Sequence, residues 1–149
     1  MAEPVTVSAA EFLAMGRETL ARQPFSVLLG AELLTLEPGR CELAVSITDQ
    51  LKQQMGFAHG GVVSYLADNA LTYAGGTAMR VPVVTSEFKI NYVRPAVGDR
   101  LIARARAAHV SRTQAVCQCE VFALTGDEEK LCAIAQGTIV QVGQKTESR

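Results

Sequence analysis

The segment from Gly60 to Met79 constrains the fold of this chain more than any other. It reads G-G-V-V-S-Y-L-A-D-N-A-L-T-Y-A-G-G-T-A-M, and Asp68 is its only charged residue. Its apolar residues do not keep to one stripe, so the segment predicts a helix that is buried nearly all round. A membrane span is the competing interpretation, but Ser64, Asn69 and several glycines interrupt the segment and argue against it. We expect Gly75-Gly76 to end the helix.

The rest of the chain predicts one short helix and several strands. Ser8-Ala9-Ala10-Glu11 is a capping box and predicts a helix over residues 9–22, which Pro24 stops. Strands over 27–36 and 41–47 are expected to form a hairpin around Pro38-Gly39, followed by a polar loop over 48–58. Four further alternating runs cover residues 84–92, 101–110, 115–124 and 131–142.

The four later runs predict the layer arrangement. In the first of them one face is expected to carry Val84, Ser86, Phe88, Ile90 and Tyr92, opposite Glu87 and Lys89. Short connections join the four runs, so we expect an antiparallel meander. One sheet wrapped on one buried helix is an α+β arrangement, and 149 residues are enough for one domain.

Composition argues against several classes of function. Fourteen basic and fifteen acidic residues give a formal charge of −1, which argues against nucleic-acid binding through a broad basic face. The N-terminal residues do not resemble a signal peptide, and the four cysteines include no C-x-x-C, so we expect reduced, buried cysteines in a cytoplasmic protein. His59 and His109 are the only histidines, and we expect no metal site.

Asp68 is the residue that most suggests chemistry. A carboxylate in the middle of a buried helix is costly unless it is hydrogen-bonded or paired, so a structural role is one interpretation. The start of the same helix favours another, because His59-Gly60-Gly61 leaves free N–H groups that suit a carbonyl oxygen gaining negative charge. Thr72 lies one turn beyond Asp68 on the same face. Gln53 is either a solvated loop residue or one whose amide holds a carbonyl or a water.

These residues together carry a family resemblance. Gln53, His59-Gly60-Gly61, Asp68 with Asn69 after it, and the strand S-E-F-K-I-N-Y-V-R-P-A resemble the hotdog-fold acyl-CoA thioesterases. The likeness is to the PaaI-like and 4-hydroxybenzoyl-CoA thioesterase subgroup and covers residues 27–142. It implies a hotdog fold, with an antiparallel sheet of five to six strands around a long central helix. Residues 1–26 are then a helical extension and residues 143–149 a flexible tail.

The resemblance also implies an activity and roles for single residues. The chain would hydrolyse a hydrophobic acyl-CoA, with a medium-chain, long-chain or aryl acyl group, to free acid and CoA without cofactor or metal. Asp68 would act as general base or as nucleophile, while the Gly60 N–H polarises the thioester carbonyl. Gln53 would help to hold the carbonyl or the water. His59 would orient the start of the helix rather than transfer protons.

Further positions follow from the same resemblance. Thr72 would hydrogen-bond to the carboxylate or to the attacking water, and Thr85 would lie near that water. The residues expected to bind CoA are Gly61, Arg94, Ser111, Arg112 and Thr113. The residues that either line an acyl tunnel or belong to the core are Met55, Phe57, Tyr73, Met79 and Phe88.

The implied assembly is a homodimer whose sheets join edge to edge, with homotetramers common in the family. Asp68 of one chain would then face Gly60 and Gln53 of the other. Two alternatives remain open. A hydratase or dehydratase acting on acyl thioesters would pair a histidine with an acid, and His59 is the only candidate near Asp68. A non-catalytic acyl-CoA-binding module would need an output domain, for which the 26 residues before the first expected strand are too few.

Overall fold

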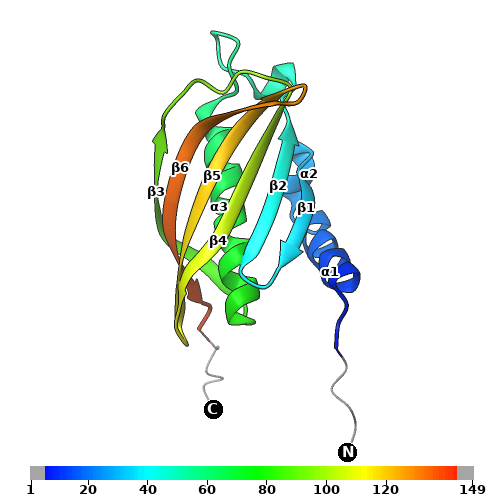
Figure 1. Ribbon diagram of the computed structural model, residues 1–149, viewed down its shortest axis with the longest axis vertical. Coiled ribbons are helices and arrows are strands. Elements are labelled where there is room, and N and C mark those ends of the chain that lie inside the picture. The colour runs from blue at the N-terminus through cyan, green and yellow to red at the C-terminus, as the bar shows by residue number, and fades with distance from the viewer. Residues whose placement is uncertain (1–5, 144–149) are drawn as a thin grey trace, which may run out of the picture.

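Helix α3 (Gly60–Met79) runs along one face of a six-stranded antiparallel sheet that wraps around it (Figure 1). The computed structural model describes residues 6–143. Apart from Gly143, the tail expected over 143–149 lies outside the described residues, as do the first five residues of the expected extension. None of the described helices is long and apolar enough to cross a membrane.

The sheet has the order β1-β2-β4-β5-β6-β3. Its strands are β1 (Glu32–Glu37), β2 (Arg40–Ser46), β3 (Val83–Tyr92), β4 (Arg100–Val110), β5 (Gln114–Thr125) and β6 (Glu128–Gln141). The other helical elements are α1 (Ala9–Ala21), α2 (Pro24–Leu29) and a 3₁₀ turn, η1 (Asp49–Leu51). The predicted N-terminal helix, the hairpin around Pro38-Gly39 and the predicted start of α3 are therefore confirmed.

The expected meander is correct only for β4, β5 and β6. Strand β3 pairs with β6 at the far edge of the sheet, so residues 93–99 carry the chain across the sheet end to β4. Three strand spacings measure about 14 Å, and seven extended residues reach up to about 25 Å. A short connection was therefore no guarantee that β3 and β4 are neighbours.

The strand predicted over residues 27–36 is wrong in its first half. Pro24 is the first residue of α2, and Gly30, with φ of 68°, ends that helix before β1 begins. Ser26 is 1% exposed and holds α2 against α3, because its hydroxyl accepts a hydrogen bond from the Tyr65 hydroxyl at 2.6 Å. Proline at the start of a helix and glycine just past its end are common helix signals. The apolar run Val27–Leu36 was nevertheless typical of a strand, which is why the helix was not predicted.

Helix α3 also does not end at Gly75-Gly76. It continues to Met79 and stops where Arg80 adopts a left-handed conformation, with φ of 57°. The absent side chain of Gly75 instead permits close packing, since a Cβ there would lie 2.8 Å from the Cβ of Ile139 on β6. This close contact fixes the position of α3 relative to β6.

The core lies between α3 and the inner face of the sheet. Leu66, Ala67, Ala70, Leu71 and Ala74 of α3 are fully buried there. All four cysteines are free and buried in the same region, as we expected from the sequence. The small alanine side chains let the sheet approach one side of α3 closely. The polar side chains of α3 lie on its other side.

Candidate active site

The His59-Gly60-Gly61 motif builds the start of α3. His59 is the N-cap residue, and its Nδ1 accepts a hydrogen bond from the Gly61 N–H at 2.8 Å. A Cβ on Gly61 would lie 2.9 Å from that Nδ1, so glycine is needed for the imidazole to sit over the helix end. The structure therefore places His59 in a capping position. It also occupies the Gly61 N–H, which is consequently not free for the CoA-binding role expected of Gly61.

Gly60 and Gln53 lie at the same hollow. Among the described residues, no group accepts a hydrogen bond from the Gly60 N–H at the first position of α3. Gln53 borders this hollow of about 380 Å³ together with Gly60, Phe57, Tyr92 and Arg94. The Gln53 Oε1 accepts a hydrogen bond from the Met55 N–H, and its backbone N–H donates to Phe57 O at 2.8 Å. Its amide is thus fixed by the loop, which leaves its NH₂ group to act as a donor.

A bulge in β3 brings Thr85 to Asp68. The register of β3 against β6 shifts between Thr85 and Glu87, so Ser86 is an extra residue that has no partner. The predicted face of β3 is therefore correct for Phe88 and Ile90 but wrong before the bulge. There Val84 and Ser86 are exposed, while Thr85 joins Phe88 on the half-buried side. The Thr85 hydroxyl donates to Asp68 Oδ1 at 2.6 Å.

Thr72 supports this pair but does not contact the carboxylate. Its hydroxyl lies 2.9 Å from the Asp68 carbonyl oxygen and 3.1 Å from Thr85 Oγ1. A hydroxyl has one proton, which it donates to one of these two oxygens. The expected hydrogen bond from Thr72 to the carboxylate is therefore replaced by contacts that orient Thr85 and the helix backbone. Asp68, Thr72 and Thr85 form one half-buried polar cluster, which we call the Asp68 cluster.

The Asp68 cluster and the helix start are separate within one chain. Asp68 lies eight positions after Gly60, and a helix rises about 1.5 Å per residue, so they stand about 12 Å apart along the axis of α3. That distance is too long for both groups to touch the same thioester. Within one chain the structure therefore joins Asp68 to Thr72 and Thr85, joins Gln53 to Gly60, and does not join the two sets.

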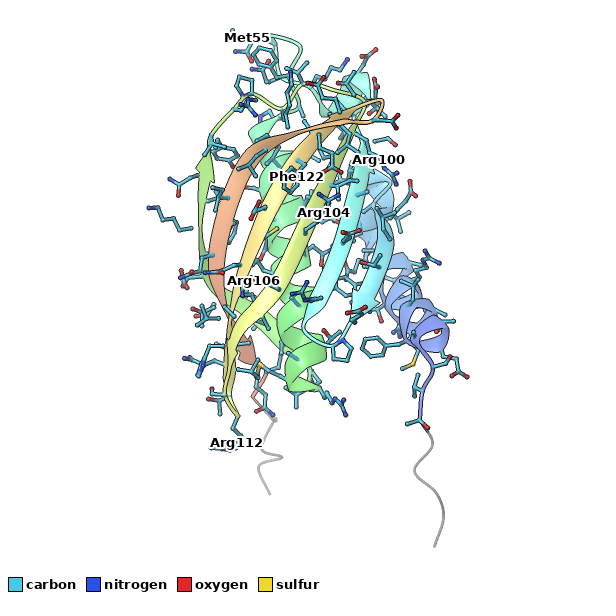
Figure 2. All side chains as sticks on the ribbon, viewed as in Figure 1. Met55, Arg100, Arg104, Arg106, Arg112 and Phe122 are labelled. Carbon is cyan, nitrogen blue, oxygen red and sulfur yellow. The ribbon has the colours of Figure 1, made fainter. Side chains whose placement is uncertain are left out.

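The residues expected to bind CoA are also divided. Arg94 lies in the connection that follows β3, where its Nη1 donates to Leu131 O at 3.2 Å. Ser111, Arg112 and Thr113 form the turn between β4 and β5 at the other end of the sheet. The connection that contains Arg94 ends at Arg100, the first residue of β4, and Figure 2 shows Arg112 far from Arg100. The eleven residues of β4 span about 35 Å. Arg94 and the Ser111–Thr113 turn of one chain cannot hold the same nucleotide.

Two features of the site were missed from the sequence. Tyr92 closes over the start of α3, where its hydroxyl lies 2.7 Å from Ser64 Oγ and donates to Gly60 O at 3.2 Å. Asn69 donates from Nδ2 to Gln23 Oε1 and to the Tyr65 hydroxyl, both at 3.1 Å. The contacts of Tyr92 with Ser64 and Gly60 and that of Asn69 with Gln23 join α3 to residues distant along the chain, so no local pattern in the sequence pairs them. Within residues 6–143, no three potential metal ligands come together.

Comparison with known proteins agrees with this architecture. Residues 55–130 match the family model described as the thioesterase superfamily. An acyl-coenzyme A thioesterase PaaI from Escherichia coli is 27% identical over 116 residues, which are 77% of this chain and 80% of that protein. A 1,4-dihydroxy-2-naphthoyl-CoA hydrolase from Listeria monocytogenes is 25% identical over 74% of this chain and 89% of that protein.

The structural comparison gives the same result. The crystal structure of a thioesterase family protein from Silicibacter pomeroyi superposes with a TM-score of 0.81 at 36% identity, covering 91% of this chain and all of that one. The chain belongs to the thioesterase superfamily, and its sheet wrapped on α3 is the hotdog fold.

Proposed function

We propose that this protein hydrolyses hydrophobic acyl-CoA thioesters to the free acid and CoA, and that Asp68 is the group that acts on the thioester or on water. The observation that carries the proposal is the Asp68 cluster in a member of the thioesterase superfamily. Oδ1 of Asp68 accepts from Thr85, and among residues 6–143 no group donates to Oδ2. One carboxylate oxygen is thus oriented and the other is left for a water or a thioester carbon. The E. coli and Listeria relatives, named as enzymes that act on CoA thioesters, support the substrate class.

Two chemical routes use the same cluster. As a general base, Asp68 takes a proton from water while the water oxygen attacks the carbonyl, and CoA leaves as its sulfur gains a proton. As a nucleophile, the Asp68 carboxylate attacks the thioester carbon, the C–S bond breaks and CoA leaves as a thiolate that takes a proton from solvent. Water then hydrolyses the resulting anhydride to the free acid and the Asp68 carboxylate. In both routes negative charge develops on the carbonyl oxygen, which the Gly60 N–H stabilises together with Gln53. A single turnover in ¹⁸O water tests the second route, because label enters Asp68 only when water attacks the Asp68 carbonyl of an anhydride.

A site shared between two subunits reconciles the two separated sets of residues. With about 12 Å between Gly60 and Asp68 along α3, one thioester reaches both only if they come from different chains. A homodimer that pairs Asp68 of one chain with Gly60 and Gln53 of its partner meets this requirement. The same arrangement, or a homotetramer, would let Arg94 and the Ser111–Thr113 turn of different chains hold the phosphates of one CoA.

The hydratase alternative has less support from the geometry. It requires a histidine and an acid that act as a pair, whereas the Nδ1 of His59 is occupied as the cap of α3, where it accepts a hydrogen bond from the Gly61 N–H. A non-catalytic acyl-CoA-binding module remains the contrasting class. It would bind acyl-CoA without releasing thiol, so the same assay separates it from the enzyme.

The test is the release of free CoA thiol from a panel of acyl-CoAs, by wild type and by Asp68→Asn. Asparagine keeps the shape of the side chain and removes the base, so we expect turnover to fall by about 10² or more. Asp127→Asn, in the exposed β5–β6 turn, is the matched control and should keep wild-type turnover. Near-normal turnover in a folded Asp68→Asn protein would exclude Asp68 from the chemistry.

A further inference from the structure

A groove between α1 and α3 opens beside the Asp68 cluster. It has a volume of about 580 Å³ and is bordered by Thr72, which contacts Thr85 at 3.1 Å. From the Asp68 cluster it follows α3 past Gly76 to Arg80, a distance of about 12 Å. The groove thus begins at the Thr72 side of the Asp68 cluster, one helical turn beyond Asp68 itself.

The lining of the groove is mainly apolar and includes no acidic side chain. Phe12, Met15 and Thr19 of α1 form one wall, and Tyr73 and Val83 contribute to the other. Arg80 is the only charged side chain at its border and lies at the end far from Thr72. A groove of this chemistry that extends about 12 Å along α3 suits an extended hydrocarbon chain better than a charged group.

The wall made by α1 is held firmly in place. The Tyr73 hydroxyl donates to Gly16 O at 2.8 Å across the floor of the groove. A Cβ on Gly16 would lie 2.7 Å from Leu33 Cδ2, so α1 is packed tightly on β1. Met15 is nevertheless 57% exposed, because it points over a groove rather than into the core. A rigid wall with an uncovered apolar side chain is a preformed binding surface.

We propose that this groove binds the acyl chain of a straight-chain acyl-CoA, and that Met15 and Thr19 of α1 determine the chain length accepted. The inference rests on the proposed function and adds the substrate class to it. The thioester lies at the Asp68 cluster, and successive methylenes of the acyl group extend past Thr72 along α3. Helix α1, in the predicted N-terminal extension, is then a specificity element rather than packing alone.

The test compares tryptophan substitutions on two faces of α1. Met15→Trp and Thr19→Trp fill the groove, whereas Ala14→Trp and Glu18→Trp place the same side chain at exposed neighbouring positions that do not border it. We expect the first pair to lower kcat/KM on decanoyl-CoA by about tenfold or more, since each methylene that loses burial costs roughly fourfold. The ratio of kcat/KM on decanoyl-CoA to that on butanoyl-CoA should therefore fall in these two variants, and the controls should match wild type on both substrates.

Binding of S-alkyl-CoA thioethers, measured by calorimetry, tests the groove without hydrolysis. Wild type should bind S-decyl-CoA more tightly than S-butyl-CoA, and Thr19→Trp should lose that difference. If no acyl-CoA is hydrolysed but this binding pattern holds, the proposed reaction fails and the groove assignment stands. Folded groove variants with an unchanged chain-length preference would overturn the assignment. The assignment would also be overturned if the groove variants changed the oligomeric state of the protein but not its chain-length preference. The groove would then be an interface between subunits.

Discussion

At the scale of single residues, the two adjacent glycines of the His59-Gly60-Gly61 motif serve different purposes. Gly61 has to lack a side chain because the His59 imidazole occupies the space beside it and accepts from its N–H. At Gly60 a Cβ would meet Tyr92 at 3.6 Å, which is an ordinary contact. Space therefore does not require glycine at position 60, and the feature of Gly60 that remains for chemistry is its backbone N–H.

A pair of substitutions at Gly60 isolates that N–H. Gly60→Pro removes the donor, and the backbone accepts it, because His59 has φ of −62° and ψ of 138°, the conformation preferred before proline. We expect turnover to fall on the order of 10²-fold, as when an oxyanion donor is lost. Gly60→Ala keeps the donor and is the control. Equal turnover in the two variants would mean that another group polarises the carbonyl.

At the scale of elements, α3 and β3 owe their function to departures from regular structure. The bulge at Ser86 turns Thr85 toward Asp68, and the glycine at position 75 lets α3 sit on β6. Both features fix the distance between the helix and the edge of the sheet. The Asp68 cluster depends on that distance, since the Thr85 hydroxyl reaches Asp68 only across this gap.

Gly75→Ala tests whether packing or helix propensity dominates in α3. Propensity alone would make alanine stabilising by about 1 kcal/mol. The new Cβ, however, would lie 2.8 Å from Ile139 Cβ in a closely packed core, and overpacking costs about 1–3 kcal/mol. We expect a lower midpoint in urea unfolding. A higher midpoint would show that the sheet can move away from α3 at little cost.

At the scale of the whole molecule, the separation of Gly60 and Asp68 along α3 determines whether one chain could hold the whole proposed site. Gly60 and Asp68 are on one helix, and their separation is fixed by its rise rather than by flexible loops. A shared site therefore predicts that two inactive variants restore activity to each other. A complete site within each chain predicts that they do not.

Co-expression of Asp68→Asn with Gly60→Pro tests whether two inactive variants restore activity to each other. In a mixed dimer, one site has both defects and the other has neither. Random mixing at equal amounts makes about half of the dimers mixed, so roughly one quarter of all sites should be intact. Thiol release from acyl-CoA should rise accordingly above either variant alone. Activity no higher than that of the parents, in samples whose mixed dimers are demonstrated by mass, would place the whole site within one chain.

The buried cysteines predict how stability depends on pH. Burial raises the pKa of Cys117 and of Cys132 to about 11 and that of Cys119 to about 12. Unfolded thiols ionise near pH 8.5, so the folded protein retains protons that the unfolded chain loses. The stabilisation is complete below about pH 8.5 and declines as pH rises toward 11. Urea midpoints should be flat from pH 7 to 8 and fall above about 8.5, with a shallower fall in Cys117→Ala.

Reaction with a disulfide reagent gives a second measurement of the same burial. Thiolate is the reactive form, so the native protein at pH 8 should react far more slowly than the protein in urea. Four thiols that react in the native state at the rate of free cysteine would contradict the burial.

The sequence alone determined where α3 starts and the position of Asp68 in its middle, because helix signals and hydrophobic patterns are local along the chain. It also determined the hairpin of β1 and β2, since a turn with glycine at the right position fixes which strands meet there. Family likeness added the hotdog fold.

Only the tertiary structure decided which elements lie beside one another. The pairing of β3 with β6, the bulge that turns Thr85 inward and the seating of α2 on α3 through Ser26 and Tyr65 all join residues far apart in sequence. Their geometry is set by packing on α3, which no local pattern encodes. The groove between α1 and α3 likewise exists only because Gly16 docks on β1 while Tyr73 bridges to it. The candidate site residues could therefore be named from the sequence. The neighbours that orient them could be identified only from the tertiary structure.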